Sequence, residues 1–169
     1  FNVEHFKERW SKVKHLQTAH KQADAILSAC AHMSASKTGA LIVITHQQEL
    51  KVFADTGEIV DATLSTRLIE NIFFKNTPLH DGALIIRDGR AWAAACILPI
   101  SKRTDLPKQY GLRHRAALGI TEKTDATAIV VSEETGKISF AQGENIQTIT
   151  INELEKQLAN IFNIETNKK

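Results

Sequence analysis

The alternation of apolar and polar positions is most regular at the start of the chain. From Val3 to Met33, apolar residues recur at spacings of three and four, which predicts one long helix. The polar positions of its first half are mostly basic: Lys7, Arg9, Lys12, Lys14 and Lys21, against Glu4 and Glu8. Two interpretations are open. The segment is either a solvated helix face or a juxtamembrane helix, because the cytoplasmic flanks of membrane spans are rich in Lys and Arg.

Beyond Gly39 the apolar residues gather in short runs of strand length. Residues 40–44 are predicted to form a buried strand, and residues 50–54 are expected to pair with it across a polar turn. Residues 64–74 return to helical spacing, and the segment leading to Pro78 ends that helix, because proline disfavours helical geometry in the residue before it.

The second half of the chain reads as hairpins and helices. Asp88-Gly89 is typical of tight hairpins and joins predicted strands over 83–87 and 90–98. The other predicted elements are a polar loop over 99–110, a helix over 113–120, strands over 126–131 and 137–141, and a last helix opened by the capping box Thr150-x-x-Glu153. Hairpins mixed with long connections predict an α/β fold, with a mixed central β-sheet flanked by helices and a long N-terminal helix.

Composition narrows the class of protein. The 169 residues are 43% hydrophobic and 24% charged, close to a globular average, which excludes disordered and collagen-like chains. A net charge of +2 gives no global argument for a nucleic acid polymer as partner. Cys30 and Cys96 show no metal-type spacing, so we expect packed thiols in a reducing compartment. No apolar run approaches the roughly 20 residues that span a bilayer.

The first candidate site is the segment that leads into the strand at residue 83. Asp81 offers a carboxylate at the start of that strand, and carboxylate oxygens suit Mg²⁺ or Mn²⁺. Gly82 lacks the Cβ that keeps a ligand away. Asp-Gly is equally an ordinary turn pair, and His80 by itself is equally a packed or surface histidine.

The second candidate site is the start of the helix after Gly111. Helix N-termini present unpaired N–H groups and the positive end of the helix dipole, so they bind anions. Cations are disfavoured there, so Arg113, His114 and Arg115 favour an external anion such as phosphate. A solvated basic turn, or an ion pair with a carboxylate, is the open alternative. The segment Ser132-Glu133-Glu134 follows a buried strand, where ligand-binding loops lie in α/β sheets, although it is equally an ordinary turn.

Taken together, these residues resemble the diadenylate cyclase (DAC) domain family, whose members condense two ATP into cyclic di-AMP and release two pyrophosphates. The resemblance covers residues 38 to 162 and rests on an ordered set of segments: Gly39-Ala40-Leu41-Ile42, Asn71-Ile72-Phe73, Asn76-Thr77-Pro78-Leu79-His80, Asp81-Gly82-Ala83, Ala95-Cys96-x-Leu98-Pro99, Arg113-His114-Arg115 and Val130-Val131-Ser132-Glu133-Glu134-Thr135-Gly136. It implies a catalytic domain over 38–163, so the predicted long helix within 1–37 is expected to be a connecting segment, and the tail over 164–169 is expected to fray.

The resemblance also implies roles for individual residues. Asp81 would hold the catalytic metal and help to activate the ribose 3′-hydroxyl, and Gly82 would let the nucleotide approach. The implied ATP-binding set is Leu98, Leu112, Arg113, His114, Arg115, Ser132 and Glu133, with Leu98 at the adenine. His80 and Glu134 would complete the coordination of Mg²⁺, Mn²⁺ or Co²⁺ between subunits.

One position departs from the family pattern. Members commonly read Gly-Thr-Arg-His-Arg, with the threonine touching ligand, and this chain has Leu112 there. A lost hydroxyl contact costs on the order of 1 kcal/mol, enough to weaken ATP binding by up to about tenfold. Leu112 therefore leaves open a nucleotide-binding sensor of the same fold. A separate alternative is a metal-dependent phosphohydrolase that uses Asp81, His80 and Glu133.

The two-fold symmetric product implies two identical sites facing each other, hence an isologous homodimer. The resemblance is closest to the bacterial housekeeping type, whose catalytic domain follows transmembrane helices. Because the chain opens with Phe1 rather than Met, we expect a membrane anchor upstream of it. The domain is then expected at the cytoplasmic face of the bacterial cell membrane, and this chain alone is expected to be soluble.

Overall fold

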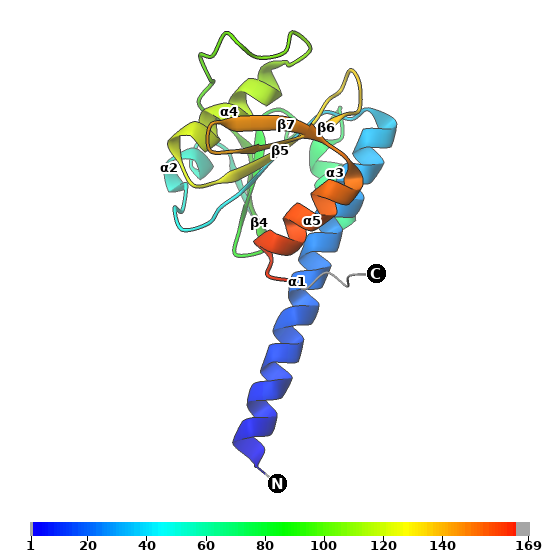
Figure 1. Cartoon of the computed structure of the whole chain (residues 1–169), viewed down its shortest axis with the longest axis vertical. Coiled ribbons are helices and arrows are strands. Elements are labelled where there is room, and N and C mark those ends of the chain that lie inside the picture. The colour runs from blue at the N-terminus through cyan, green and yellow to red at the C-terminus, as the bar shows by residue number, and fades with distance from the viewer. Residues whose placement is uncertain (1, 165–169) are drawn as a thin grey trace.

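The computed structural model describes residues 2–164, which form a seven-stranded sheet in the order β2-β4-β3-β1-β5-β6-β7 (Figure 1). The strands are β1 (Ala40–Ile44), β2 (Glu58–Thr63), β3 (Ala83–Arg87), β4 (Arg90–Cys96), β5 (Thr127–Val131), β6 (Ile138–Gln142) and β7 (Asn145–Ile149). The helices are α1 (Val3–Ser36), α2 (Lys51–Ala54), α3 (Thr66–Phe73), α4 (Leu112–Lys123) and α5 (Ile151–Ile161). Strands β1 and β3 run parallel, and the other neighbouring pairs are antiparallel, so the predicted mixed α/β sheet is confirmed.

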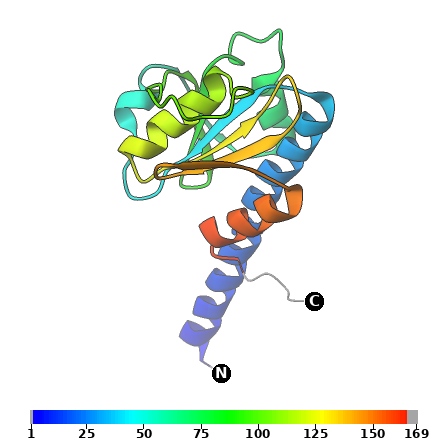
Figure 2. The same ribbon diagram turned by 45° about the horizontal axis from the view of Figure 1, so that its top comes forward.

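Alternating side chains of the central strands bury both faces of the sheet. Ile42 and Ile44 of β1 pack into one hydrophobic cluster with residues of α1, α3 and α5. Leu41 and Val43 pack into a second cluster with residues of α4 and with Leu50 and Ala54. The sheet therefore lies between two helical layers (Figure 2).

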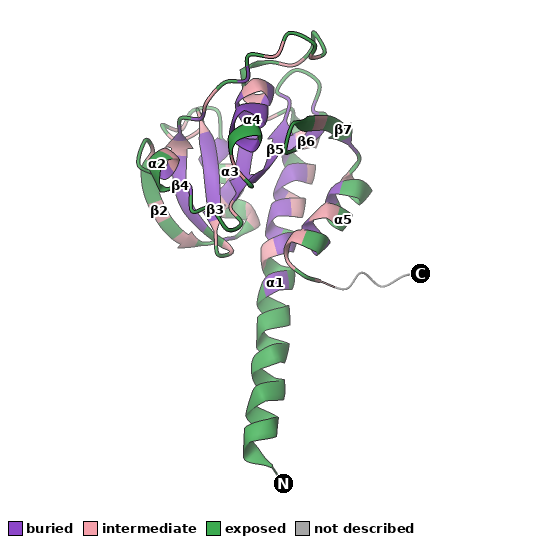
Figure 3. Cartoon of the chain, turned by 60° about the vertical axis from the view of Figure 1, so that its left-hand side comes forward, coloured by how far each residue is buried: buried purple, intermediate pink, exposed green. Residues whose placement is uncertain are grey.

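The two halves of helix α1 differ in their surroundings, since the first is exposed to solvent and the second is packed on the domain. The side chain of Asn2 caps its start by accepting from the N–H groups of Glu4 and His5. Its second half packs on the sheet and on α3 and α5, while residues 2–18 are exposed and project away from the domain (Figure 3). The predicted long helix is confirmed, but only its second half is part of the core. No helix among residues 2–164 is long and apolar enough to cross a membrane.

The expectation for residues 50–54 was wrong. These residues form the single turn α2, begun by Leu50 in the left-handed region with φ 61°. Leu50 and Ala54 bury their side chains beneath that turn, which explains the apolar run. The hydrogen-bonding neighbours of β1 are instead β3 and β5.

The predicted turn and cap chemistry is confirmed. Asp88 and Gly89 have φ values of 50° and 70°, as a tight two-residue hairpin requires. Thr150 and Glu153 form the predicted capping box at the start of α5. Of the predicted frayed tail over 164–169, the N–H of Ile164 donates to the Ala159 carbonyl, and the other positions lie outside the described residues.

Candidate functional site

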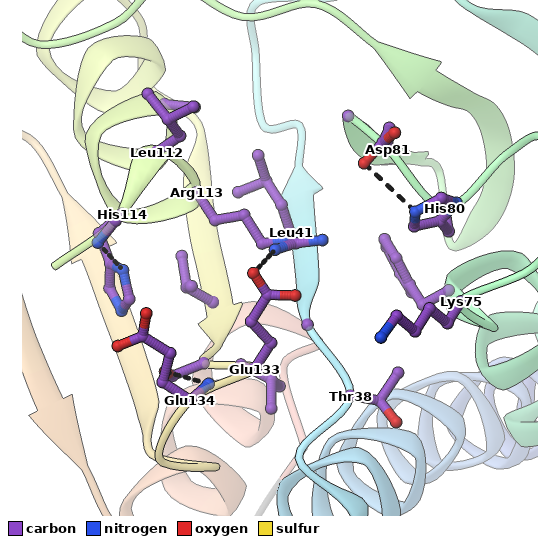
Figure 4. A pocket seen from close by; sticks show the side chains of 18 of the residues that line it. Thr38, Leu41, Lys75, His80, Asp81, Leu112, Arg113, His114, Glu133 and Glu134 are labelled. Carbon is purple, nitrogen blue, oxygen red and sulfur yellow. Dashed lines mark hydrogen bonds and ion pairs between the residues drawn. The ribbon is translucent and has the colours of Figure 1, made fainter.

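A cavity of about 920 Å³ opens where the two candidate segments meet. Its walls come from the end of α1, the segment before β3, the end of β4, the start of α4 and the turn between β5 and β6. Figure 4 shows His80 and Asp81 on one side, and Arg113, His114 and the two glutamates of the turn on the other. The strand pairing of β1 with β3 and β5 brings together two segments that lie more than thirty residues apart in sequence.

Arg113 occupies the first turn of α4 and reaches into this cavity. Its side chain is 24% exposed, and its Nη1 lies 3.5 Å from Oε1 of Glu133. A Cβ at Gly39 would lie 2.6 Å from the Arg113 Cζ, so the guanidinium fills the space where position 39 has no side chain. This ion pair between Arg113 and Glu133 is one of the alternatives that the sequence left open. At 3.5 Å it is a loose contact, so the guanidinium is available to another anion.

His114 is buried and fixes the first turn of α4. Its Nδ1 accepts a hydrogen bond of 3.1 Å from the Gly111 N–H, and its ring stacks on Tyr110 at 4.3 Å between centroids. Burial, with a smaller contribution from the neighbouring Arg113 charge, lowers the pKa of His114 below its ordinary 6.5. The imidazole is therefore neutral near pH 7, and because Nδ1 accepts, Nε2 carries the proton.

Arg115 points elsewhere. Among the residues that the structure describes, it is not part of the cavity lining, and its Nη1 donates to the Arg103 carbonyl at 2.8 Å. Arg103 in turn donates two hydrogen bonds to Asp105. Arg115 thus holds the loop between β4 and α4, and its predicted role as a phosphate ligand stays a prediction.

Asp81 and His80 form the opposite wall. The Asp81 carboxylate is 85% exposed and lies 3.4 Å from Nε2 of His80. Nδ1 of His80 lies 2.7 Å from the Thr77 carbonyl. Because a carbonyl can only accept, Nδ1 must carry a proton, and in the neutral ring Nε2 then has its lone pair free beside Asp81.

Gly82 has a structural reason to be glycine. Its φ is +92°, and a Cβ there would lie 2.7 Å from the Cys96 carbonyl oxygen. The glycine therefore lets the Asp81 segment lie directly against β4. Whether it also admits a nucleotide, as the resemblance implies, stays a prediction.

The remaining predicted residues lie around the cavity. Leu98 is buried in its wall, and Leu112 is 75% exposed at its rim. Ser132 caps the β5–β6 turn, since its Oγ accepts from the N–H groups of Glu134 and Thr135 at 3.2 Å each.

His80, Asp81 and Glu134 are the residues predicted to hold a metal. No group of three or more His, Cys, Asp or Glu side chains suited to a metal exists among residues 2–164. His80 and Asp81 supply two adjacent donors, while Glu134 lies across the cavity from them (Figure 4). Two adjacent donors are fewer than a divalent cation usually takes, so a metal held here would need further ligands.

Sequence reasoning missed Lys37, Thr38 and Lys75, which also line the cavity. The side chain of Lys75 extends into it in Figure 4. The available signal was a lysine, Lys75, a short distance before the candidate Asp81 in the sequence. The two cysteines are buried, as expected, and burial raises the pKa of Cys30 to about 12 and of Cys96 to about 11, so both remain unreactive thiols.

Comparisons with known proteins point to one family. The model of the family described as DisA bacterial checkpoint controller nucleotide-binding (DAC) matches residues 27–146. Diadenylate cyclase CdaS of Bacillus thuringiensis is 44% identical over 126 residues, 75% of this chain and 63% of that protein. Cyclic di-AMP synthase CdaA of Bacillus subtilis is 39% identical over 142 residues, 84% of this chain and 52% of that protein. The chain thus spans between half and two thirds of these relatives.

Solved structures share the fold. A double mutant of DacA from Staphylococcus aureus superposes with a TM-score of 0.82 at 38% identity, covering 85% of this chain and 96% of that one. A protein from Bacillus cereus described as a hypothetical membrane spanning protein gives a TM-score of 0.74 at 43% identity, covering 77% of this chain and 64% of that one. The chain belongs to the DAC family.

Proposed function

We propose that this chain is the catalytic domain of a diadenylate cyclase, which condenses two ATP into cyclic di-AMP and releases two pyrophosphates. The observation that carries the proposal is the placing of Asp81 opposite Arg113 and His114 across one cavity. Family membership supports it, as do the names of the relatives, which are called diadenylate cyclases and cyclic di-AMP synthases.

The start of α4 is the phosphate-binding wall. The free N–H groups of its first turn and the Arg113 guanidinium both point to an anion. A polyphosphate carries more charge than the single carboxylate of Glu133, which is 62% exposed, so it displaces Glu133 from Arg113. The same donors then stabilise the charge that develops as pyrophosphate leaves.

The adenine is proposed to lie on the apolar part of the cavity wall. Leu41 and Leu98, 2% and 6% exposed, form a rigid apolar floor there. A planar base covers such a floor with little loss of polar contacts, and this fixes where the ribose lies.

Asp81 and His80 are the proposed metal-binding wall, for Mg²⁺, Mn²⁺ or Co²⁺. When bound, such an ion would neutralise phosphate charge and lower the pKa of the attacking ribose 3′-hydroxyl. Within the chain, the Thr77 carbonyl orients the His80 ring, and Asp81 supplies an exposed carboxylate. Glu134 of a second copy is the proposed source of a further donor.

A homodimer is part of the proposal, because cyclic di-AMP has two-fold symmetry. The 3′-hydroxyl of each ATP must reach the α-phosphorus of the other, so two cavities must face each other around an isologous axis. The high exposure of Asp81 at the cavity mouth suits such a face-to-face arrangement.

The two alternatives are less well supported. The sensor hypothesis was motivated by Leu112, whose side chain lies exposed at the rim of the cavity. In the described residues, the only buried side-chain N or O atom without a hydrogen bond is Ser139 Oγ, which lies outside the cavity. Leu112 therefore leaves no polar partner stranded. The phosphohydrolase is not favoured by the relatives, which are named as cyclases and synthases.

The location is also a proposal. We place the domain at the cytoplasmic face of the bacterial membrane, attached to a preceding anchor. Both cysteines are unpaired thiols, which fits a reducing compartment that also holds ATP. One structural relative is described as membrane spanning, and the curated relatives are longer than this chain.

The test is product analysis by ion-exchange chromatography after incubation with ATP and Mn²⁺, Mg²⁺ or Co²⁺. We expect cyclic di-AMP from the wild type. Asp81→Asn should lower turnover at least about a hundredfold but change ATP affinity only about threefold, since its carboxylate acts mainly in the transition state.

Asp88→Asn is the matched control, because it makes the same change in the exposed β3–β4 turn, where asparagine tolerates the positive φ. It should leave turnover unchanged. Formation of ADP or AMP alone, or equal losses of binding and turnover in Asp81→Asn, would count against the proposal.

A further inference from the structure

The first half of α1 carries apolar side chains that are exposed to solvent. Five of the eleven exposed large hydrophobic residues of the described chain lie on it, with exposures between 44% and 57%: Val3, Phe6, Trp10, Val13 and Leu16. We call these five residues the α1 stripe. The rings of Phe6 and Trp10 stack on each other along it, with centroids 6.5 Å apart. A contiguous apolar surface of this kind marks an interaction site rather than scattered exposure.

The α1 stripe faces away from the domain. At 3.6 residues per turn, Phe6, Trp10 and Val13 lie on the side of the helix roughly opposite to Ile26 and Met33. The latter two residues are 0% and 2% exposed and pack on the sheet. A flat surface can therefore lie along the stripe without meeting the rest of the molecule, which lies on the other side of the helix axis.

Basic side chains border the α1 stripe on both edges. Lys7 and Lys14 are seven residues apart, two helical turns, and form a row along one edge. Arg9 and Lys12 lie along the other edge, three or four residues from members of the stripe. Within residues 2–164, the one ion pair that these cations make is loose, 3.9 Å between Lys7 Nζ and Glu4 Oε1, both largely exposed.

The acidic residues lie on the remaining face. Glu4 and Glu8 are four residues apart and form one row on the side of the helix opposite to the α1 stripe. The helix surface is thus ordered as apolar stripe, basic edges and acidic back.

This order selects between the two occupants that an exposed apolar helix face can have. Two copies paired along the stripe would bring the rows of Lys and Arg against each other in either orientation, and like charges facing across an interface oppose association. An anionic lipid surface meets the same rows with opposite charge. Lys and Arg side chains can then extend to the lipid headgroups while their aliphatic stems cover apolar surface. Trp side chains are favoured at the boundary between headgroups and acyl chains.

We infer that the α1 stripe and its basic edges bind the surface of an anionic lipid bilayer, with the helix lying in the plane of the interface. This inference does not depend on the proposed catalytic activity, nor on any anchor upstream of the chain. It assigns α1 a second role, to hold the cavity at a set distance and orientation from a membrane.

The test uses the chain as it stands, with vesicles of phosphatidylcholine alone or with about a third phosphatidylglycerol, in flotation and in fluorescence. The second of the two tryptophans, Trp92, is buried in the core and only 8% exposed. A blue shift of the emission on adding vesicles therefore reports Trp10. We expect flotation and a blue shift with the anionic vesicles only, weakening as salt is added.

Two variants separate the two parts of the surface. Lys7→Glu/Lys14→Glu should weaken binding to anionic vesicles at least about tenfold, because each basic residue near the surface contributes severalfold. Trp10→Ser/Val13→Ser should weaken it comparably, since it removes inserted apolar area. The matched controls are Glu4→Gln/Glu8→Gln on the acidic back and Val52→Ser, a 76% exposed residue of α2, and neither should reduce binding.

Three results would overturn the inference. The first is no binding to anionic vesicles, and the second is binding that charge reversal leaves unchanged. The third is a fall in self-association of Trp10→Ser/Val13→Ser without lipid, which would assign the stripe to a second copy of the chain. All these positions are exposed and outside the core, so the variants should keep the circular dichroism spectrum of the wild type.

Discussion

The position of Arg113 depends on a residue without a side chain. Gly39 ends the connection from α1 to β1, and the Arg113 guanidinium lies where its Cβ would be. Any side chain there must push the guanidinium out of its place at the cavity. Gly39 is therefore a positioning residue for the phosphate-binding wall.

We predict that Gly39→Ala weakens ATP binding toward the level of Arg113→Ala, which should itself cost about tenfold because it removes a charge-assisted contact. The measurement is calorimetric ATP affinity in a double-mutant cycle. In the Arg113→Ala background, Gly39→Ala should have little further effect. Additive losses would mean that position 39 does not act through Arg113.

His114 is predicted to make stability depend on pH. Its folded pKa is lowered, mainly by burial, so between that value and the ordinary 6.5 the unfolded chain binds more protons than the folded one. Stability is then full above pH 6.5 and falls as the pH is lowered through the folded pKa.

The measurement is the free energy of unfolding in urea from about pH 7.5 to about pH 5.5. His114→Gln should lose less stability over this range than the wild type, because its amide oxygen can accept from the Gly111 N–H and does not titrate. An unchanged pH profile would show that His114 does not carry this dependence.

Among the elements, the loop between β4 and α4 depends on the helix it precedes. Arg115 donates to the Arg103 carbonyl within that loop, and the Ser101 N–H donates to the Arg115 carbonyl. These two contacts tie the loop to the start of α4.

We predict that Arg115→Ala loosens this loop, with a loss of about 1 kcal/mol in stability, the usual value of one such hydrogen bond at a half-buried site. Limited proteolysis should cut the loop faster than in the wild type. ATP affinity should fall less than in Arg113→Ala. An equal fall in affinity would instead give Arg115 the phosphate-binding role that the family resemblance implies.

The elements that sequence predicted well are those with strong local chemistry. The Asp88-Gly89 turn, the Thr150 cap and the buried runs of β1, β3 and β5 each follow from a few adjacent residues. The missed elements are β2 and β7, the two edge strands, whose residues are mostly exposed and lack the apolar signal of a buried run.

In the candidate site, too, the features set by local sequence were predicted and those set by tertiary packing were not. The segments around Asp81 and Arg113 were found from sequence, because each has unusual local chemistry. Sequence reasoning did not find the contact between Gly39 and Arg113, nor that the Arg115 side chain points away from the cavity. Both depend on tertiary packing between residues distant in the chain.

For the whole molecule, the central question is whether two cavities act together. A single chain presents the His80–Asp81 pair and one proposed phosphate-binding wall, which is half of what the proposed symmetric ring closure needs. The proposed mechanism therefore requires assembly of two copies, and assembly obeys mass action.

The most direct measurement is the rate of cyclic di-AMP formation per chain at saturating ATP and metal, over enzyme concentrations on both sides of the dimer dissociation constant found by sedimentation. The proposed mechanism predicts that this specific activity rises with concentration and levels off once the dimer is saturated. Wild type mixed with excess Asp81→Asn should give more linear intermediate and less closed ring, because a mixed pair has only one competent attack. A constant specific activity from far below to far above the dissociation constant would contradict the account.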